Sequence, residues 1–260
     1  MLEKLFKISG IYSIYEKWLK NQVVNGAIPR HIGVILDGNR RWAEKLGMAP
    51  WLGHKMGASQ VEELIRWCRE LGVEVLTLYV FSLDNFKRSR DEIEEISNLL
   101  RTEVRKAMED EDVMKQKIRF KMIGNKEVVS PSLLKEIEEL EKKTEKNDSM
   151  TVNIAFAYGG KREIVDAARK VAEEALMGKL SPDEIDEKTF PRYLYTSHLD
   201  PPDVDMIIRT SGEMRLSGFL LWQSAYSELV FLDVYWPDFR KIDLMRAIRI
   251  FQKRTRRYGE

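Results

Sequence analysis

The sequence predicts an α/β protein with a single domain and a mostly parallel six-stranded central sheet flanked by helices. Short runs of apolar, often β-branched residues alternate along the chain with segments of helical periodicity. The runs are continuously apolar, which is typical of strands covered on both faces. No linker rich in proline, glycine or serine and no repeat divides the 260 residues. We therefore expect one sheet with right-handed crossovers.

Six apolar runs are the expected strands. They are residues 31–36, 73–81, 118–123, 150–157, 204–209 and 228–234. Helices are expected at residues 40–46, 57–71, 90–112, from 131 onward, 161–177 and 241–258. Gly72, directly after one of these helices, is a C-terminal cap signal, and Ser130-Pro131 combines an N-cap residue with proline at the first helical position.

The first 28 residues form a separate predicted segment, an amphipathic, aromatic-rich helix that precedes a domain of residues 29–260. Apolar and aromatic side chains from Leu2 to Leu19 are interspersed with lysines. Two interpretations stay open. The helix packs on the body of the fold, or it lies on a membrane surface or over an apolar cleft. We expect no segment that spans a bilayer, because no stretch is long and apolar enough.

Composition narrows the class of protein. The single cysteine, Cys68, excludes an intramolecular disulfide and is typical of a reducing compartment, so we expect a cytoplasmic protein that contacts membranes at most peripherally. Cys68 lies in a helical pattern and is expected in the core. A formal net charge of +1 gives no general attraction to nucleic acid, and we expect no such partner.

The segment from Arg30 to Trp42 is the strongest candidate for chemistry. Its apolar run stops at Asp37, and a glycine, an asparagine and two arginines follow. Asp37 has two interpretations: the N-cap of the next helix, or a ligand of Mg²⁺ beside a substrate phosphate. The chain has no G-x-x-x-x-G-K-[ST] and no G-x-G-x-x-G after a strand, which argues against P-loop and dinucleotide sites.

Basic and polar residues also follow other expected strands. Parallel sheets bind ligands beyond the carboxyl ends of their strands. Residues 82–88, 158–162 and 210–217 supply arginine, lysine, glycine, amide and a few acidic residues there. These strand ends predict an electropositive rim that suits a diphosphate and a divalent cation.

Several motifs, in order along the chain, resemble one family. They are residues 31–42, Gly53-His54-Lys55 with Gly57, residues 76–82 with Asn85, residues 153–160, residues 208–213, and residues 219–228 leading to Trp236-Pro237. From about residue 29 to residue 259 this order resembles the cis-prenyltransferases, the undecaprenyl diphosphate synthase family. The N-terminal segment and the doubled arginine Arg40-Arg41 are most similar to archaeal and eukaryotic members.

The resemblance implies a reaction, a cofactor and partners. An allylic diphosphate primer, geranylgeranyl or farnesyl diphosphate, loses its diphosphate, and isopentenyl diphosphate attacks and leaves a new cis double bond. Repetition would yield a polyprenyl diphosphate of about undecaprenyl length, the precursor of a glycosyl carrier lipid. Mg²⁺ is the implied cofactor, and a homodimer is the implied assembly.

The resemblance also implies roles for individual residues. Asp37 and Asn85 are the catalytic candidates, Asp37 as a Mg²⁺ ligand and Asn85 in positioning for proton transfer. Glu228 matches a second metal ligand, although the residues alone fit equally a rim carboxylate paired with an arginine. Substrate binding would involve Gly38, Asn39, Arg40, Arg41, Trp42, His54, Ser82, Leu83, Asp84, Phe86 and Arg88, and, for isopentenyl diphosphate, Arg209, Arg215, Leu216 and Ser217.

The end of the chain adds one further match. Arg257 and Gly259 fit a C-terminal R-x-G signature, which implies a substrate-binding tail that reaches the active site of the partner subunit. Two positions depart from the family pattern: Pro50 stands where bacterial members usually carry arginine, and Met214 where histidine is frequent. Both departures bear on diphosphate affinity and primer choice.

A hydrophobic product tunnel is expected between the sheet and its helices. Its expected lining is Val80, Ile93, Leu99, Leu100, Val104, Met108, Ile123 and Leu133. The long helical segment at residues 90–112 favours a deep tunnel, and the depth of a tunnel limits the chain that it can hold.

Three other classes of protein compete with this hypothesis. A non-catalytic subunit of the same fold, which binds and activates a catalytic partner, would lack Asp37 and the amide loop around Asn85. A trans-prenyltransferase is all-helical and carries D-D-x-x-D motifs, and Asp200-Pro201-Pro202-Asp203 is not one because its prolines would break a helix. The third is a phosphate-binding regulatory module without turnover.

Overall fold

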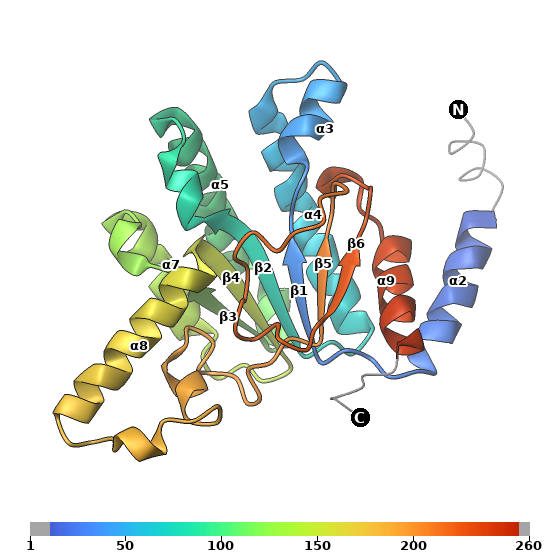
Figure 1. Cartoon of the computed structure of the whole chain (residues 1–260). Helices are drawn as coiled ribbons and strands as arrows, with labels where there is room; N and C mark the ends of the chain where they lie inside the picture. Colours follow the sequence, from blue (N-terminus) through green and yellow to red (C-terminus); the bar gives the residue numbers. More distant parts are fainter. Residues whose placement is uncertain (1–10, 255–260) are drawn as a thin grey trace.

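The structure, a computed structural model, describes residues 11–254 and contains one sheet of six parallel strands (Figure 1). The strands are β1 (His31–Ile35), β2 (Val75–Ser82), β3 (Ile118–Ile123), β4 (Met150–Tyr158), β5 (Met206–Arg209) and β6 (Glu228–Phe231). Their order across the sheet is β3-β4-β2-β1-β5-β6, and every neighbouring pair is parallel. The predicted six-stranded parallel sheet is therefore confirmed.

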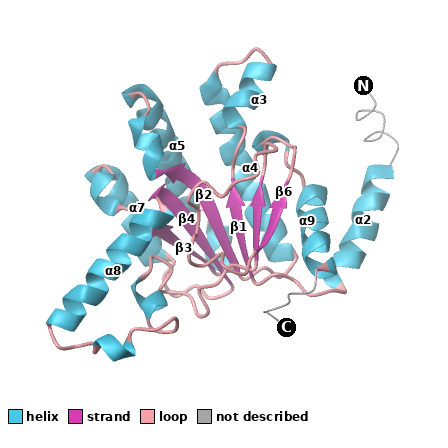
Figure 2. Cartoon of the chain, in the orientation of Figure 1, coloured by secondary structure: helices cyan, strands magenta, loops and turns pink. Residues whose placement is uncertain are grey.

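Helices lie on both sides of the sheet (Figure 2). They are α2 (Ile11–Val24), α3 (Asn39–Lys45), α4 (Pro50–Glu70), α5 (Arg90–Glu109), α6 (Glu111–Lys115), α7 (Pro131–Lys143), α8 (Gly160–Leu176) and α9 (Lys241–Lys253). Each expected helix is present, but three boundaries were wrong. The helix expected over residues 241–258 ends at Lys253, before Arg254, whose backbone is extended. Helix α4 begins at Pro50, whose ring suits the first helical turn. The expected helix 90–112 breaks at Asp110, whose extended backbone ends α5 and whose side chain caps α6.

Strands β5 and β6 are shorter than predicted because neighbouring loops take over their hydrogen bonds. The backbone N–H of Val204 donates to Gln223, outside the ladder. After β6, the carbonyl oxygens of Leu232 and Val234 accept from Gly212 and Ser211, in the loop that follows β5. The end of β6 therefore holds the loop after β5 in place, which matters for the site described below.

Two hydrophobic clusters lie on opposite faces of the sheet. Val34 and Leu78 belong to the larger cluster, whereas their chain neighbours Ile35 and Tyr79 belong to the smaller one. Successive side chains of a strand point to opposite faces, so the two clusters fill the two layers of the protein. This arrangement explains why the strands are continuously apolar.

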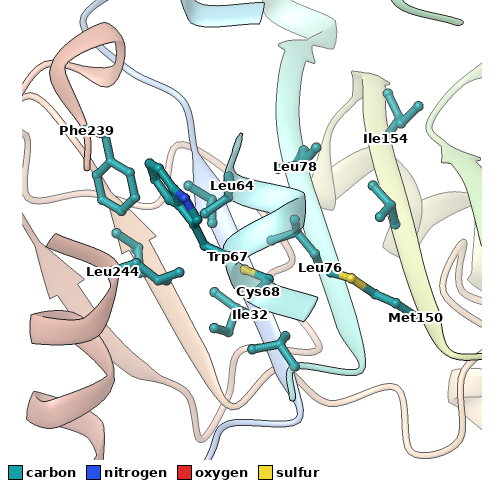
Figure 3. Close-up of a cluster of buried hydrophobic side chains, with 14 of the residues drawn as sticks. Ile32, Leu64, Trp67, Cys68, Leu76, Leu78, Met150, Ile154, Phe239 and Leu244 are labelled. Atoms are coloured by element: carbon teal, nitrogen blue, oxygen red, sulfur yellow. The ribbon is translucent and has the colours of Figure 1, made fainter. Parts of the chain in front are cut away.

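Figure 3 shows part of the larger cluster, where α4 and α9 pack against β1 and β2. Leu64, Trp67 and Cys68 on α4 belong to the same cluster as Ile32 on β1 and Leu244 on α9. Cys68 is fully buried, and burial raises the pKa of its thiol. The expectation that Cys68 is a core residue is confirmed.

The described part of the N-terminal segment packs on α9 (Figure 1). Leu19 and Val23 of α2 are buried in the larger cluster, and Tyr15 lies against Arg246 of α9. Ile14 and Trp18 are exposed on the other side of α2. Residues 11–24 therefore follow the first interpretation, a helix packed on the fold. No helix among residues 11–254 is long and apolar enough to cross a membrane.

Candidate active site

The carboxyl ends of β1, β2 and β5 meet at one edge of the sheet and surround Asp37. Gly38 follows with φ 102°, a conformation that glycine adopts readily, and is itself the N-cap of α3. A Cβ atom on Gly38 would stand 2.6 Å from the Tyr235 ring. The interpretation of Asp37 as the N-cap of this helix is wrong, because its carboxylate turns away from α3 toward β5.

The Asp37 carboxylate is held by arginines. Its Oδ2 accepts from Nη2 of Arg209 at 2.7 Å, and its Oδ1 lies 3.4 Å from Nη2 of Arg41. Thr210 fixes the backbone on both sides, because its Oγ1 accepts from the Asp37 N–H and donates to the Asp37 carbonyl. Burial alone would raise the pKa of Asp37, but the hydrogen bond and charge of Arg209 outweigh burial and lower it. The carboxylate is therefore ionised at neutral pH.

Arg209 is the most buried cation of the site, with 5% of its surface exposed. Its Nη1 donates to the Arg215 carbonyl and to Ser217 Oγ, the latter at 2.8 Å. Tyr79 donates to the Ser217 carbonyl at 3.1 Å and so braces the same loop from β2. The Nε of Arg209 is buried and finds no hydrogen-bond partner among the described residues. A buried guanidinium with an unused donor is suited to an anionic ligand.

A second carboxylate, Glu213, holds the two more exposed arginines. Its Oε1 accepts from Arg41 at 3.1 Å, and its Oε2 accepts from Arg215 at 2.5 Å. Arg41 also donates to Ser211 Oγ at 2.7 Å. Three arginines and two acids thus form one network across the ends of β1 and β5. Glu213 and Ser211 were not among the predicted site residues, although both lie in the motif that follows β5.

The end of β2 forms a second wall of the site. Ser82 and Asn85 cap the short 3₁₀ helix Leu83–Lys87 reciprocally: Ser82 Oγ accepts from the Asn85 N–H, and Asn85 Oδ1 accepts from the Ser82 N–H. No other hydrogen bond of the Asn85 side chain occurs within the described residues. Its Nδ2 is therefore available to a ligand. Asp84 pairs with Lys87 in solvent.

Other predicted binding residues lie around these two walls. Arg88 pairs with Glu92, and Arg40 pairs with Glu44 on the outer side of α3. His54, on α4, is partly buried, and burial lowers its pKa. Leu216 packs against the smaller hydrophobic cluster, Phe86 packs on Phe81 and Phe156, and Trp42 is half-buried in α3. Arg257 and Gly259 lie outside the described residues.

The two positions that depart from the family pattern are both at the periphery. Pro50 is an exposed residue at the start of α4, where it has no side chain that could donate to a phosphate. Met214 is among the most exposed apolar residues of the described chain. It stands between Glu213 and Arg215, so the loop projects it away from the network that those residues form.

Glu228 lies at the opposite edge of the sheet from Asp37. In the strand register, Glu228 stands beside Met206 and Met206 beside Ile32, at the amino ends of their strands. Asp37 is farther along β1 by roughly 16 Å at the usual rise of a strand. Glu228 forms an ion pair with Arg254, in which Oε2 of Glu228 accepts a hydrogen bond from Nη1 of Arg254 at 2.6 Å. Asp37 and Glu228 of one chain therefore cannot share a metal ion, and Glu228 fits the rim carboxylate that the residues alone allowed.

The donor set at Asp37 fits Mg²⁺ that arrives with a phosphorylated substrate. Residues 11–254 contain no group of three or more His, Cys, Asp and Glu side chains placed to hold a metal. Mg²⁺ commonly takes only one or two carboxylates and completes its shell with substrate phosphates and water. Asp37 supplies an ionised carboxylate, and its Oδ1 is only loosely held by Arg41. That oxygen is the candidate ligand.

A cavity of about 550 Å³ leads away from this site along the larger hydrophobic cluster. It begins near Leu36, Asn39 and His54 and continues between the sheet and helices α4 and α5 toward Ile118. Of the predicted lining residues, Val80, Leu99, Leu100 and Val104 line it. Ile93, Met108, Ile123 and Leu133 do not; Ile123, for example, belongs to the cluster on the other face of the sheet.

An arginine-rich cluster suited to anions, beside an apolar cavity at the carboxyl ends of a parallel sheet, is the arrangement expected of an enzyme that handles prenyl diphosphates. The family model described as "Putative undecaprenyl diphosphate synthase" matches residues 35–259. The chain belongs to this family, and it is a prenyl transferase.

Curated relatives match the chain almost from end to end. A tritrans,polycis-undecaprenyl-diphosphate synthase (geranylgeranyl-diphosphate specific) of Thermococcus kodakarensis is 48% identical over 98% of this chain and 95% of its own. An isoprenyl transferase of Thermus thermophilus is 48% identical over 100% of both chains. The crystal structure of lavandulyl diphosphate synthase from Lavandula x intermedia, in complex with dimethylallyl diphosphate, matches with a TM-score of 0.84 and 36% identity, over 90% of this chain and 99% of that one.

Proposed function

We propose that this protein condenses isopentenyl diphosphate repeatedly onto an allylic diphosphate primer and makes a cis-polyprenyl diphosphate of about undecaprenyl length. The observation that carries the proposal is the buried Arg209, which donates to the Asp37 carboxylate through Nη2 and whose Nε has no hydrogen-bond partner among the described residues. Geranylgeranyl diphosphate is the proposed primer. A relative of 48% identity is named as specific for it, which supports this choice.

The two substrates divide the site between them. The allylic diphosphate binds beside Asp37, with backbone donors from Gly38 onward and the guanidinium of Arg41. Isopentenyl diphosphate binds to Arg209, Arg215 and Ser217, because guanidinium groups can hold phosphate oxygens through two parallel hydrogen bonds. Glu213 keeps two of these arginines in position until the substrates arrive.

When the primer loses its diphosphate, negative charge is concentrated on that leaving diphosphate. The arginines of the site are already oriented by carboxylates, so they stabilise that charge with little reorganisation. Mg²⁺ held by Asp37 would add Lewis-acid stabilisation of the leaving diphosphate. Asn85 is a poor base, so we assign it to positioning: its free Nδ2 donates to a substrate oxygen, and the proton leaves to substrate diphosphate.

The cavity receives the growing apolar tail. Leu78, Val80, Leu100 and Val104 line its middle, and a polyprenyl chain gains about 0.8 kcal/mol for each CH₂ group that leaves water. This gain supports retention of the tail between condensations. The product would serve as the precursor of a glycosyl carrier lipid.

The proposed assembly is a homodimer in which Arg257 and Gly259 of one chain reach the active site of the other. The proposed setting is the cytoplasm, with peripheral contact to a membrane surface. The exposed Ile14 and Trp18 on α2 support that contact, since tryptophan and aliphatic side chains favour the lipid–water interface.

A non-catalytic subunit of the same fold is the alternative. It is not favoured, because Asp37, Arg209 and Arg215 are present and form one network. The test incubates purified protein with Mg²⁺, labelled isopentenyl diphosphate and, in turn, geranylgeranyl and farnesyl diphosphates. We expect butanol-extractable polyprenyl products that separate by length.

Asp37→Ala is the matched control for that experiment. Loss of the carboxylate should lower kcat by at least ~10²-fold. Thermal unfolding should still show a cooperative transition, because Thr210 continues to fix the backbone of residue 37. Absence of product from the unaltered protein with every primer, or undiminished product from Asp37→Ala, rules out the proposed function.

A further inference from the structure

Tyr235, in the loop between β6 and α9, lies against the arginine network, although it was not among the predicted site residues. Its ring faces two cations of α3. The guanidinium carbon of Arg41 lies 5.7 Å from the ring centroid, and Nζ of Lys45 lies 6.0 Å from it. A cation is attracted to the face of an aromatic ring at distances up to about 6 Å. Arg41 and Lys45 therefore share one aromatic partner.

The chain around Tyr235 fixes the position of its ring. The backbone N–H of Trp236 donates to the Asp37 carbonyl at 3.0 Å, and the Trp236 side chain is fully buried. A Cβ atom on Gly38 would lie 2.6 Å from the Tyr235 ring, so the ring lies directly against this glycine. The same ring thus contacts the backbone that follows Asp37 and faces the two cations of α3.

An aromatic ring can restrain Arg41 without using its hydrogen-bond donors. Glu213 holds Arg41 through an N–H group, and a diphosphate would compete for the same donor. The ring face attracts the charge of the guanidinium group and needs no N–H group in return. The Arg41 side chain is 41% exposed, and a long exposed side chain samples many rotamers unless a neighbour restrains it. The ring can therefore keep Arg41 in place while its donors turn from Glu213 to a ligand.

Lys45 brings a second positive charge to this side of α3. It follows Arg41 by four residues, so the two side chains lie one turn apart on the same face of the helix. Like charges in this arrangement repel each other and destabilise the helix. Arg41 is paired with Glu213, but Lys45 is exposed and forms no ion pair within residues 11–254. An anion bound beside the ring would relieve the repulsion, so this face of α3 favours an anionic ligand.

We propose that Tyr235 is a positioning residue for the allylic diphosphate, and that it acts through Arg41 and Lys45. This inference rests on the proposed polyprenyl synthase function. The ring holds both cations beside Asp37 and Gly38, where the diphosphate of the primer binds. Arg41 and Lys45 donate to the diphosphate oxygens, while the ring remains their common partner.

The test measures the dissociation constant of geranylgeranyl diphosphate by titration calorimetry. Mg²⁺ is present and isopentenyl diphosphate is absent, so that no condensation occurs. Tyr235→Leu removes the aromatic face, and we expect the dissociation constant to rise about 3- to 10-fold. Tyr235→Phe keeps the ring and should stay within about twofold of the unaltered protein. Lys45→Gln removes one exposed charge and should raise the dissociation constant about threefold.

Two controls separate positioning from a general loss of structure or charge. In steady-state assays, Tyr235→Leu should leave the KM for isopentenyl diphosphate within about twofold, because the proposed site of that substrate is built on other arginines, Arg209 and Arg215. Lys115→Gln on α6 removes the same charge from an exposed ion pair with Glu111, and it should leave the affinity for the primer unchanged.

A second variant covers the case in which Tyr235→Leu does not fold. Tyr235→Met then takes its place, since methionine adapts to irregular space and has no aromatic face. The inference is overturned by a folded Tyr235→Leu or Tyr235→Met variant with the original affinity, by an equal loss in Tyr235→Phe, or by an unchanged affinity in Lys45→Gln. An equal loss in Lys115→Gln also overturns it. If the unaltered protein binds the primer but forms no product, the proposed function is contradicted, and the dissociation constants still test the role of Tyr235.

Discussion

At the scale of single residues, two carboxylates of the chain position the three arginines of the site. Asp37 and Glu213 hold Arg209, Arg41 and Arg215 in fixed positions, and the three guanidinium groups outnumber the two carboxylates. The remaining positive charge favours anions, and a diphosphate can replace the carboxylates as the hydrogen-bond acceptor. We therefore propose that Glu213 positions Arg41 and Arg215 for both substrates.

Arg209 and Arg215 carry the same charge but differ in burial, which predicts different effects on stability. The side chain of Arg209 is 6% exposed, whereas that of Arg215 is 62% exposed. Arg209→Ala leaves the Arg215 carbonyl and Ser217 Oγ without their donor and should lower the free energy of unfolding by ~2 kcal/mol. Arg215→Ala should change it by less than ~0.5 kcal/mol. Urea unfolding of both variants measures the difference.

Both variants should nevertheless bind isopentenyl diphosphate poorly. Loss of one charge-assisted hydrogen-bond donor corresponds to a rise in KM of about 10- to 100-fold. Steady-state kinetics at saturating primer checks this. An unchanged KM in Arg215→Ala, with folding intact, would remove Arg215 from the substrate site.

At the scale of helices, two glycines allow α4 to approach the start of α3. A Cβ atom on Gly53 would lie 2.0 Å from the Asn39 carbonyl oxygen, and one on Gly57 would lie 2.3 Å from Asn39 Oδ1. Trp236 also donates to the Gly57 carbonyl at 2.8 Å. The motif around His54 is therefore a packing device that fixes α3, and with it Arg41, beside Asp37.

Gly53→Ala should separate these helices. The added methyl group would clash with backbone, which cannot yield as a flexible side chain does, and we expect a loss of ~1–3 kcal/mol in the free energy of unfolding. The KM for the allylic primer should rise as well, since α3 carries part of its site. Thermal unfolding and kinetics measure the two effects. Ser59→Ala, at an exposed position of α4, is the control; equal effects in both variants would contradict this explanation.

A buried chain of hydrogen bonds links three strands on the smaller-cluster face. His31 Nε2 lies 2.7 Å from Thr77 Oγ1, Thr77 accepts from Asn153 Nδ2 at 3.0 Å, and Asn153 Oδ1 lies 2.8 Å from His198 Nε2. His31 is fully buried, and burial lowers its pKa to about 3. This ring is neutral in the folded protein at every pH where the enzyme would work.

The lowered pKa of His31 determines whether the free energy of unfolding rises or falls with pH. The unfolded chain binds a proton to His31 near pH 6.5, whereas the folded chain does not until about pH 3. Stability is therefore complete above pH 6.5 and falls with acid, by about 1.4 kcal/mol per pH unit for this residue. Urea unfolding between pH 6.5 and pH 5 measures the slope. His31→Gln should show a shallower slope, and a slope equal to that of the unaltered protein would contradict this origin.

At the scale of the whole molecule, the sequence predicted that the site lies at the carboxyl ends of the strands. It did not predict the order of the strands or the face of the sheet to which each side chain points. Asp37 could be found because an apolar strand ends at it. Glu228 is the first residue of its expected strand, and a parallel sheet already places such a residue at the amino ends; the register adds that it stands beside Met206. Ile123 was expected in the tunnel, and only the pleat decides that it points to the other face. The order of the strands, and the face to which each side chain points, depend on pairing between segments far apart in the sequence. A local sequence pattern does not predict such pairing.

Glu213 shows the opposite case, a residue that local reasoning could have found. It follows β5 by a few positions, lies between arginines in the network and is the only acid of that loop. Conversely, the ion pair between Glu62 and Lys106 needed the fold, because the two residues come from two helices and meet only when these pack together.

The last prediction concerns the assembly. If the tail of one subunit completes the active site of the other, two inactive variants should restore each other in a mixed dimer. Asp37→Ala removes the site of its own chain but keeps Arg257, and Arg257→Ala keeps Asp37 but removes the tail. In the mixed dimer, the site with an intact Asp37 receives an intact Arg257 from the other chain. Random exchange makes half of the dimers mixed, each with one complete site of two, so about a quarter of the original activity should return.

Mixing is done by co-refolding, or by co-expression with two different affinity tags. Dimers purified through both tags are all mixed, so about half of the original activity, rather than a quarter, is expected for them. The control mixes each variant with itself, which should leave activity at the level of the single variant. Arg254→Ala, which removes the ion pair to Glu228 within one chain, is the matched control for loss of a C-terminal arginine. A tail that serves its own subunit would give no recovery in the mixed dimer, because the site with an intact Asp37 would then keep the defective tail of its own chain.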